Sequence, residues 1–215
     1  MRVLVYVILI CTTFSVAWAE QTYVFFKDAN LEKAVAEELG KEPPLTASEM
    51  QQLFTLNCGD INSLEGLENA TNLEELIIPD SKIENLAPIR SLNGLRILSL
   101  WNNRIKNISP LSDLEHLQVV HLNDNNISDL EPLTSLHSLQ KLTLQNNPLN
   151  KRAYSVVIPK IRKNNPGITI YHDKTLTPAK ALSYAKYSAV VVVILALVIF
   201  LAIVLYSNLP RKRQL

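Results

Sequence analysis

Three stretches of the chain repeat one pattern and decide its fold: LRILSLWNNRI at residues 95–105, LQVVHLNDNNI at 117–127 and LQKLTLQNNPL at 139–149. Aligned without gaps, all three have apolar residues at the first, fourth, sixth and last positions and asparagine at the ninth. Each stretch begins 22 residues after the one before, and LEELIIPDSKI at 73–83 keeps the same step. A fixed period of this length indicates a solenoid of stacked repeats.

A second apolar set keeps the same step in the other half of each repeat: Leu64, Leu86, Ile108 and Leu130, then Leu67, Ile89, Leu111 and Leu133. One period further back, the pattern predicts a degenerate opening repeat. There Phe54, Leu56 and Ile61 would point inward, and Gly59 would stand in the place of asparagine. The sequence therefore predicts five repeats over residues 51–150.

The residue types explain how such a repeat folds. The alternation of Leu98 and Leu100 predicts a short strand with both side chains inward, and Ile105 returns to the core after a turn. Asparagine at one fixed position can bond backbone groups of neighbouring turns that lack regular partners. That column consists of Ser81, Asn103, Asn125 and Asn147.

Both ends of a solenoid need caps. In the predicted helical cap at residues 20–50, Asp28 can begin a helix and Gly40 can end it. The apolar face of that helix would be Leu31, Val35 and Leu39, and Thr46-Ala47-Ser48-Glu49 reads as a capping box for a second helix. Residues 151–173 predict a C-terminal cap with a final strand after Pro166-Gly167, and the shielding residues would be Tyr154, Val157, Ile158 and Ile161.

The pattern L-x-x-L-x-L-x-x-N-x-I resembles the leucine-rich repeat family. Its period, together with ISPL at 108–111 and LEPL at 130–133, is similar to the bacterial internalin-type class, and the two caps resemble those of that class. This resemblance covers residues 24–173 and implies an α/β solenoid whose parallel sheet lines a concave, protein-binding face. Pro79, Ser81 and Gly59 depart from the pattern.

The N-terminus has the features of a secretory signal. Arg2 precedes an apolar run from Val3 to Val16, and Ala17-Trp18-Ala19 supplies small residues at the cleavage site. We expect a signal peptide at residues 1–19; the alternative is an uncleaved membrane anchor.

A second apolar run, residues 189–205, carries no polar side chain and ends before Arg211-Lys212-Arg213. We expect a linker at 174–187, a transmembrane helix at 188–207 and a cytoplasmic tail at 208–215. The chain would then be a single-pass protein of the cytoplasmic membrane with its repeats extracytoplasmic, in a periplasm or on an open cell surface.

The alternate residues of each predicted strand point outward and form the candidate binding face. By the 22-residue step, the first row is Leu53, Glu75, Ile97, Val119 and Lys141, and the second is Thr55, Ile77, Ser99, His121 and Thr143. The third row is Asn57, Pro79, Trp101, Asn123 and Gln145. Trp101 would anchor a patch with Ile77, Ile97, Val119 and His121. The alternative is that β-branched residues merely suit a sheet surface.

The charge is balanced overall but uneven along the chain. The net charge is +1, which gives no general attraction to nucleic acid. Residues 20–94 hold 5 basic and 14 acidic residues, whereas 95–186 hold 12 basic and 6 acidic. The basic excess is concentrated in the closing segment, where it predicts either contact with anionic lipid or envelope polymer or a solvated helix face. Its residues are Lys151, Arg152, Lys160, Arg162 and Lys163.

Candidate catalytic and metal-binding groups are few. The four histidines lack metal-ligand spacing, no nucleophile accompanies the neighbours His121 and Asp124, and Cys58 is expected to be a free buried thiol. We therefore expect no enzyme activity, no cofactor and no small-molecule substrate. The sequence predicts a membrane-anchored module that recognises an unidentified protein; the alternative is a rigid envelope spacer without a specific ligand.

Overall fold

The computed structural model describes residues 22–173. The predicted signal peptide, linker, transmembrane helix and tail lie outside these residues. Within the described part of the chain, no helix is both long and apolar enough to cross a membrane.

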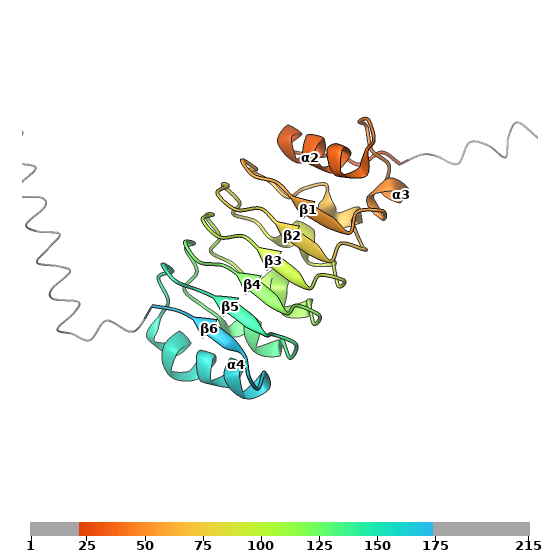
Figure 1. Cartoon of the computed structure of the whole chain (residues 1–215). Helices are drawn as coiled ribbons and strands as arrows, with labels where there is room; N and C mark the ends of the chain where they lie inside the picture. The colour runs from red at the N-terminus through yellow and green to blue at the C-terminus, as the bar shows by residue number, and fades with distance from the viewer. Residues whose placement is uncertain (1–21, 174–215) are drawn as a thin grey trace, which may run out of the picture. The chain divides into compact units, whose positions relative to one another are not determined.

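Six short strands form one parallel sheet in which sequence order and spatial order are the same (Figure 1). They are β1 (Thr55–Asn57), β2 (Glu75–Ile77), β3 (Ile97–Ser99), β4 (Val119–His121), β5 (Lys141–Thr143) and β6 (Thr169–Tyr171). From β2 to β5 the paired residues are 22 apart, as Ile97 with Val119 and Val119 with Lys141. Successive strands are therefore equivalent turns of one solenoid.

The other side of the solenoid is made of short 3₁₀ helices, one after each of the first four strands. They are η1 (Leu67–Asn69), η2 (Ala87–Ile89), η3 (Ser109–Asp113) and η4 (Glu131–Ser135). Proline stands in the first turn of η2, η3 and η4, where its fixed φ suits a helix start and its missing N–H is not needed. The leucines and isoleucines between the sheet and these helices form one continuous core, with side chains that are almost completely buried.

The asparagine column is confirmed as a ladder of buried hydrogen bonds. Asn103 Oδ1 accepts from the Ile83 N–H at 2.9 Å, while its Nδ2 donates to the carbonyl of Ile78 at 2.9 Å. Asn125 and Asn147 make the same bonds one and two coils further on. The ladder therefore satisfies backbone groups at the turn, where the sheet has ended.

One residue per coil, just before the ladder, has a positive φ. These residues are Asp60, Asp80, Asn102, Asp124 and Asn146, the residue types that tolerate the left-handed region best after glycine.

The first coil differs from the prediction because its turn is two residues shorter. Thr55 of β1 pairs with Glu75, only 20 residues on, whereas Ile61 and Ile83 remain 22 apart at equivalent turn positions. Extrapolating the 22-residue step was therefore wrong here: Phe54 is 55% exposed and Leu53 is buried. The residue directly after β1 is Cys58, as Ile78 is the residue directly after β2, so Leu56 does not hold the position predicted for it. The shorter turn also lacks the position at which Gly59 was expected to replace asparagine.

The predicted N-terminal cap helices are present as α2 (Ala29–Leu39) and α3 (Ala47–Met50). Asp28 caps α2 through the N–H groups of Asn30 and Leu31, and Gly40 ends it with a φ of 61°. Thr46 and Glu49 form the predicted capping box of α3. Leu31 and Val35 are completely buried. A Cβ at Gly66 would lie 2.5 Å from the ring of Phe26, so only glycine lets this segment pack on the first coil.

The other end is closed by the π-helical η5 (Ala153–Val157) and α4 (Ile158–Asn164), which lead into β6. As predicted, Val157, Ile158 and Ile161 are buried, and Tyr154 is partly buried against the core. Arg152 and Lys160 both pair with Glu131 at 3.2 Å. These two charges of the basic segment are therefore engaged within the domain, and the Lys160 and Arg152 hydrogen bonds lower the pKa of Glu131.

Candidate protein-binding face

The strand register defines three rows of outward side chains, which together we call the strand face. The first row is Thr55, Glu75, Ile97, Val119, Lys141 and Thr169, and the second is Asn57, Ile77, Ser99, His121, Thr143 and Tyr171. The third row, Pro79, Trp101, Asn123 and Gln145, follows the strand ends. Backbone hydrogen bonds between adjacent coils continue there; for example, the Asp80 N–H donates to the Trp101 carbonyl. The predicted site residues are thus brought together on one surface.

Two corrections to the predicted rows follow from the shorter first coil. Leu53 belongs to the core. Thr55 lies in the first row instead of the second, and Asn57 lies in the second row instead of the third. Thr169 and Tyr171 are two further members of the face that were not predicted from the sequence. Tyr171 is 47% exposed beside Thr143, and the segment Thr169-Ile170-Tyr171 already had the alternation that places its first and third residues outward.

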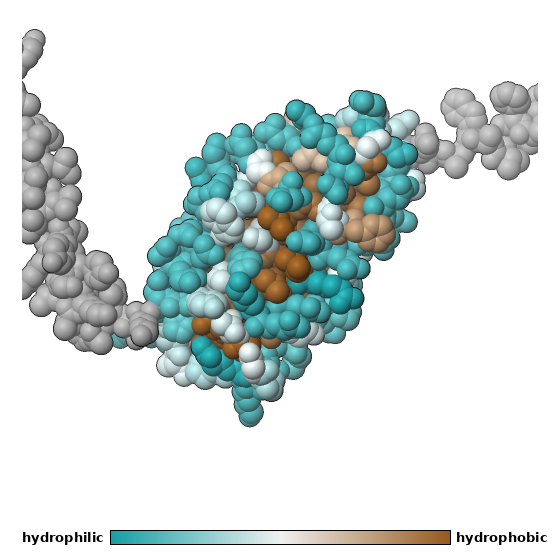
Figure 2. Space-filling model, in the orientation of Figure 1, coloured by the Kyte–Doolittle hydropathy of each residue, from teal (hydrophilic) through white to brown (hydrophobic). Residues whose placement is uncertain are grey.

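The apolar part of the face lies over the middle strands. Ile77, Ile97, Trp101 and Val119 are all partly exposed. Figure 2 shows a band of hydrophobic surface crossing the strands between hydrophilic borders. Because these side chains stand on a hydrogen-bonded sheet, their positions are set by the backbone before any partner arrives.

Two of the predicted site residues are less accessible than expected. Ser99 is 6% exposed and Thr143 is 8% exposed. Both are short side chains between larger ones in adjacent strands: Ser99 lies between Ile77 and His121, and Thr143 lies between His121 and Tyr171. They can support their neighbours more readily than they can contact a partner.

A hydrogen-bonded relay occupies the β4–β5 end of the face. Thr143 Oγ1 donates to Asn123 Oδ1 at 2.8 Å, and Asn123 Nδ2 donates to Asp124 Oδ2 at 2.7 Å. Because the Thr143 hydroxyl has only one hydrogen, His121 Nδ1 must donate to it across their separation of 3.1 Å. Neutral His121 therefore carries its hydrogen on Nδ1 and leaves Nε2 as an acceptor.

The surroundings of His121 favour its neutral form. Burial, and next the positive charge of Lys141, lower the pKa of His121. Hydrogen bonds from Asn123 and Asn146 lower the pKa of Asp124. His121 and Asp124 are connected only through Thr143 and Asn123, so the relay lacks the direct base–carboxylate contact of a catalytic pair.

One polar atom on the strand face is left unsatisfied. Gln145 Oε1 is buried and accepts no hydrogen bond from any residue between 22 and 173. An orphaned buried acceptor costs free energy, and a donor from a partner would reach this one only after the Gln145 side chain rotates outward.

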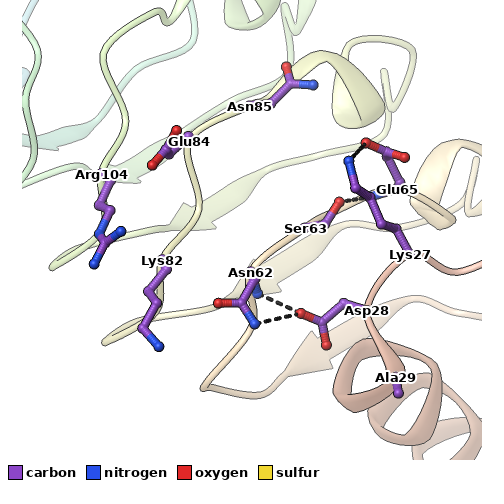
Figure 3. A pocket seen from close by; sticks show the side chains of 10 residues that line it. All are labelled: Lys27, Asp28, Ala29, Asn62, Ser63, Glu65, Lys82, Glu84, Asn85 and Arg104. Carbon is purple, nitrogen blue, oxygen red and sulfur yellow. Dashed lines mark hydrogen bonds and ion pairs between the residues drawn. The ribbon is translucent and has the colours of Figure 1, made fainter.

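Away from the face, a cavity of about 620 Å³ opens on the turn side near the N-terminal cap (Figure 3). Two of its three carboxylates, Asp28 and Glu65, are already bonded, to Asn62 and Lys27 respectively. The remaining charged side chains in the lining have mixed sign, and no group of three potential metal ligands occurs among the residues that the structure describes.

Cys58 is a free thiol packed against the core near the first turn, and it is partly rather than fully buried. Burial, followed by the negative charge of Asp28, raises its pKa to about 11.

Comparison with known proteins gives matches to repeats and to folds. A family model described as Leucine Rich repeats (2 copies) matches residues 93–135 and 115–152. Comparison with curated protein sequences gives no match.

Among solved structures, internalin InlF from Listeria monocytogenes is similar, with 23% identity and a TM-score of 0.58 over 69% of this chain and 51% of that one. A leucine-rich repeat protein of Leptospira interrogans is 27% identical, with a TM-score of 0.51 over 60% of this chain and 33% of that one. This chain thus spans about half the length of the internalin it matches. Residues 93–152 are therefore leucine-rich repeats, and the described part of the chain has an internalin-like α/β leucine-rich repeat fold.

Proposed function

We propose that this chain is a membrane-anchored recognition protein whose strand face binds a protein ligand without catalysis. The observation that carries the proposal is the partly exposed cluster of Ile77, Ile97, Trp101 and Val119 on an ordered sheet. A contiguous apolar patch with an aromatic anchor and a polar border is typical of protein interfaces.

The polar groups around the cluster support the same function. His121 Nε2 offers an acceptor, and Lys141 offers a positive charge. A protein surface that presents a donor to His121 and a carboxylate to Lys141 beside apolar side chains would complement both. The internalin-like fold supports binding as the class of function, since leucine-rich repeat domains commonly serve as recognition surfaces.

We propose the location from the sequence at the two ends of the chain. A signal peptide at residues 1–19 and a transmembrane helix at 188–207 would display the repeats outside the cytoplasmic membrane. Protease added to cells, or to spheroplasts if there is an outer membrane, should then remove the repeats and leave a small fragment with the basic tail. Full protection of the repeats would contradict this topology.

The binding function is tested by Trp101→Ala, with Phe25→Ala as the matched control. Phe25 is also an exposed aromatic residue, 79% accessible, but it precedes the sheet and lies in none of the three rows. In native membranes, chemical crosslinking should capture a partner with the control but about thirtyfold more weakly with Trp101→Ala, since a lost anchor costs about 2 kcal/mol. Both variants should keep the melting temperature of the native protein.

The alternative function, a rigid spacer without a ligand, makes the opposite prediction. A spacer would lose no partner when Trp101 is replaced, although it would still fail when the solenoid is unfolded. Equal capture by Trp101→Ala and the native chain would therefore favour the spacer.

A further inference from the structure

The first row of the strand face has an order that is complementary to itself. From β2 to β5 it reads Glu75, Ile97, Val119 and Lys141: a negative charge, two apolar side chains and a positive charge. Glu75 and Lys141 form no ion pair with any residue in the described range 22–173, and both side chains reach solvent. The two charges are therefore available to a partner.

We propose that the occupant of this face is a second copy of the same chain, which makes the recognition proposed above self-recognition. A two-fold axis parallel to the strands, between β3 and β4, would set β2 of one copy against β5 of the other and β3 against β4. Glu75 then faces Lys141 of the second copy, and Ile97 faces Val119. Because the axis repeats every contact, the interface gains two ion pairs at its ends and an apolar centre.

The second row fits the same axis. Ser99 comes to face His121 of the second copy. Ser99 is a short side chain and only 6% exposed, so the surface is low at this position and has room for the imidazole of the second copy. The outermost strands are paired in the same way: β1 of one copy faces β6 of the other, so that Asn57 faces Tyr171 of the second copy.

The available area is enough for a dimer of moderate affinity. Six strands about 4.8 Å apart, with two outward positions on β1 and β6 and three on each of the others, give, with their side chains, roughly 600 Å² per copy. Two copies would bury roughly 1,200 Å², the lower end of the range for specific complexes. In the proposed topology both copies lie in one membrane, which raises their local concentration and favours a contact of this size.

Reversing the two charges tests the pairing. The full chain, purified in a neutral detergent, is followed by sedimentation equilibrium as the native protein, Glu75→Lys, Lys141→Glu and the double variant. Each single variant should dimerise at least tenfold more weakly than the native protein, because two like-charged contacts replace the two ion pairs. The double variant should recover native dimerisation. Glu115→Lys, an exposed change of the same charge away from the sheet, should have no effect.

Mixing the two single variants gives the decisive result. A mixed pair has opposite charges at both ends, so an equimolar mixture of Glu75→Lys and Lys141→Glu should dimerise about as well as the native chain. Failure of the mixture to recover would overturn the two-fold pairing, as would a dimer indifferent to both single changes. A native chain that stays monomeric while Trp101-dependent capture of a different protein persists would overturn the second-copy assignment and leave the recognition function intact.

Discussion

Replacing Asn125 by alanine should unfold the repeats at a much lower temperature, because this side chain serves two neighbouring coils. Its Oδ1 accepts from the Ile105 N–H at 2.9 Å, and its Nδ2 donates to the Leu100 carbonyl at 2.8 Å. The same Nδ2 lies 3.2 Å from the carbonyls of Leu122 and Asn123. Alanine removes all of these bonds in a largely buried region, since Asn125 is only 6% exposed.

The magnitude follows from the groups left behind. A buried backbone group left without a partner costs about 1–3 kcal/mol, which applies to the Ile105 N–H. The Leu100 carbonyl keeps a bond from Asn103 Nδ2 at 3.2 Å and adds about 1 kcal/mol, so the total loss is about 3 kcal/mol. A typical domain is stable by roughly 5–15 kcal/mol, so this loss is a large part of the total. At about 2–4 °C per kcal/mol for a domain of this size, the melting temperature should fall by about 6–12 °C.

The neighbouring residue supplies the control. Asn126 is exposed, and its side chain makes no hydrogen bond within the described residues, so Asn126→Ala should change stability by less than about 0.5 kcal/mol. Both variants are compared with the native protein by thermal and urea unfolding, followed by circular dichroism. Equal melting temperatures for Asn125→Ala and Asn126→Ala would refute the assignment of the ladder as a stabilising element.

Three further outcomes are expected. Val35→Asp places a charge at a completely buried position of the cap and should lower the stability by about 3 kcal/mol or more. Lys33→Asp, on the exposed side of the same helix, should not, and equal unfolding curves for the two variants would contradict the packing of α2. Because the pKa of Cys58 is about 11, its alkylation rate, read from its own peptide by mass spectrometry, should be slow at pH 8 and rise steeply toward pH 11; fast labelling at pH 8 would contradict this. The NMR resonances of His121 should titrate below pH 6.5, and Lys141→Ala should raise that midpoint; an unchanged midpoint would exclude the effect of the Lys141 charge. Because the unfolded chain binds this proton at a higher pH than the folded chain, the contribution of His121 to stability should fall as the pH falls through 6.5 toward the lower folded pKa.

The interior of the solenoid could be predicted from the sequence because every core position recurs. A single leucine is ambiguous, but Leu98 belongs to a column whose members share one environment, so the period assigns all of them at once. The prediction failed where the period itself changes. The residues around Gly59 do not indicate that this turn is two residues shorter, because the N-terminal cap, and not a preceding coil, packs against it. Asp28 of the cap accepts from the Asn62 N–H at 2.7 Å.

The composition of the strand face could be predicted, but its accessibility could not. Alternation places Ser99 and Thr143 outward, yet both are buried because the side chains beside them in adjacent strands are large. The relay from His121 to Asp124 also depends on side-chain geometry across two coils, which spacing alone does not report. Tyr171 was missed because β6 follows a helical cap and not another 22-residue repeat.

The equal step from β2 to β5 has a consequence for how the protein responds to mechanical force. Each of these coils contacts only the coil before and the coil after it, so tension along the chain can peel them off one at a time. Every 22-residue coil released would lengthen the chain by about 75 Å, which single-molecule pulling would record as evenly spaced steps. The shorter first coil is tied to α2 through Asp28 and Asn62, and should come away together with its cap as one larger event.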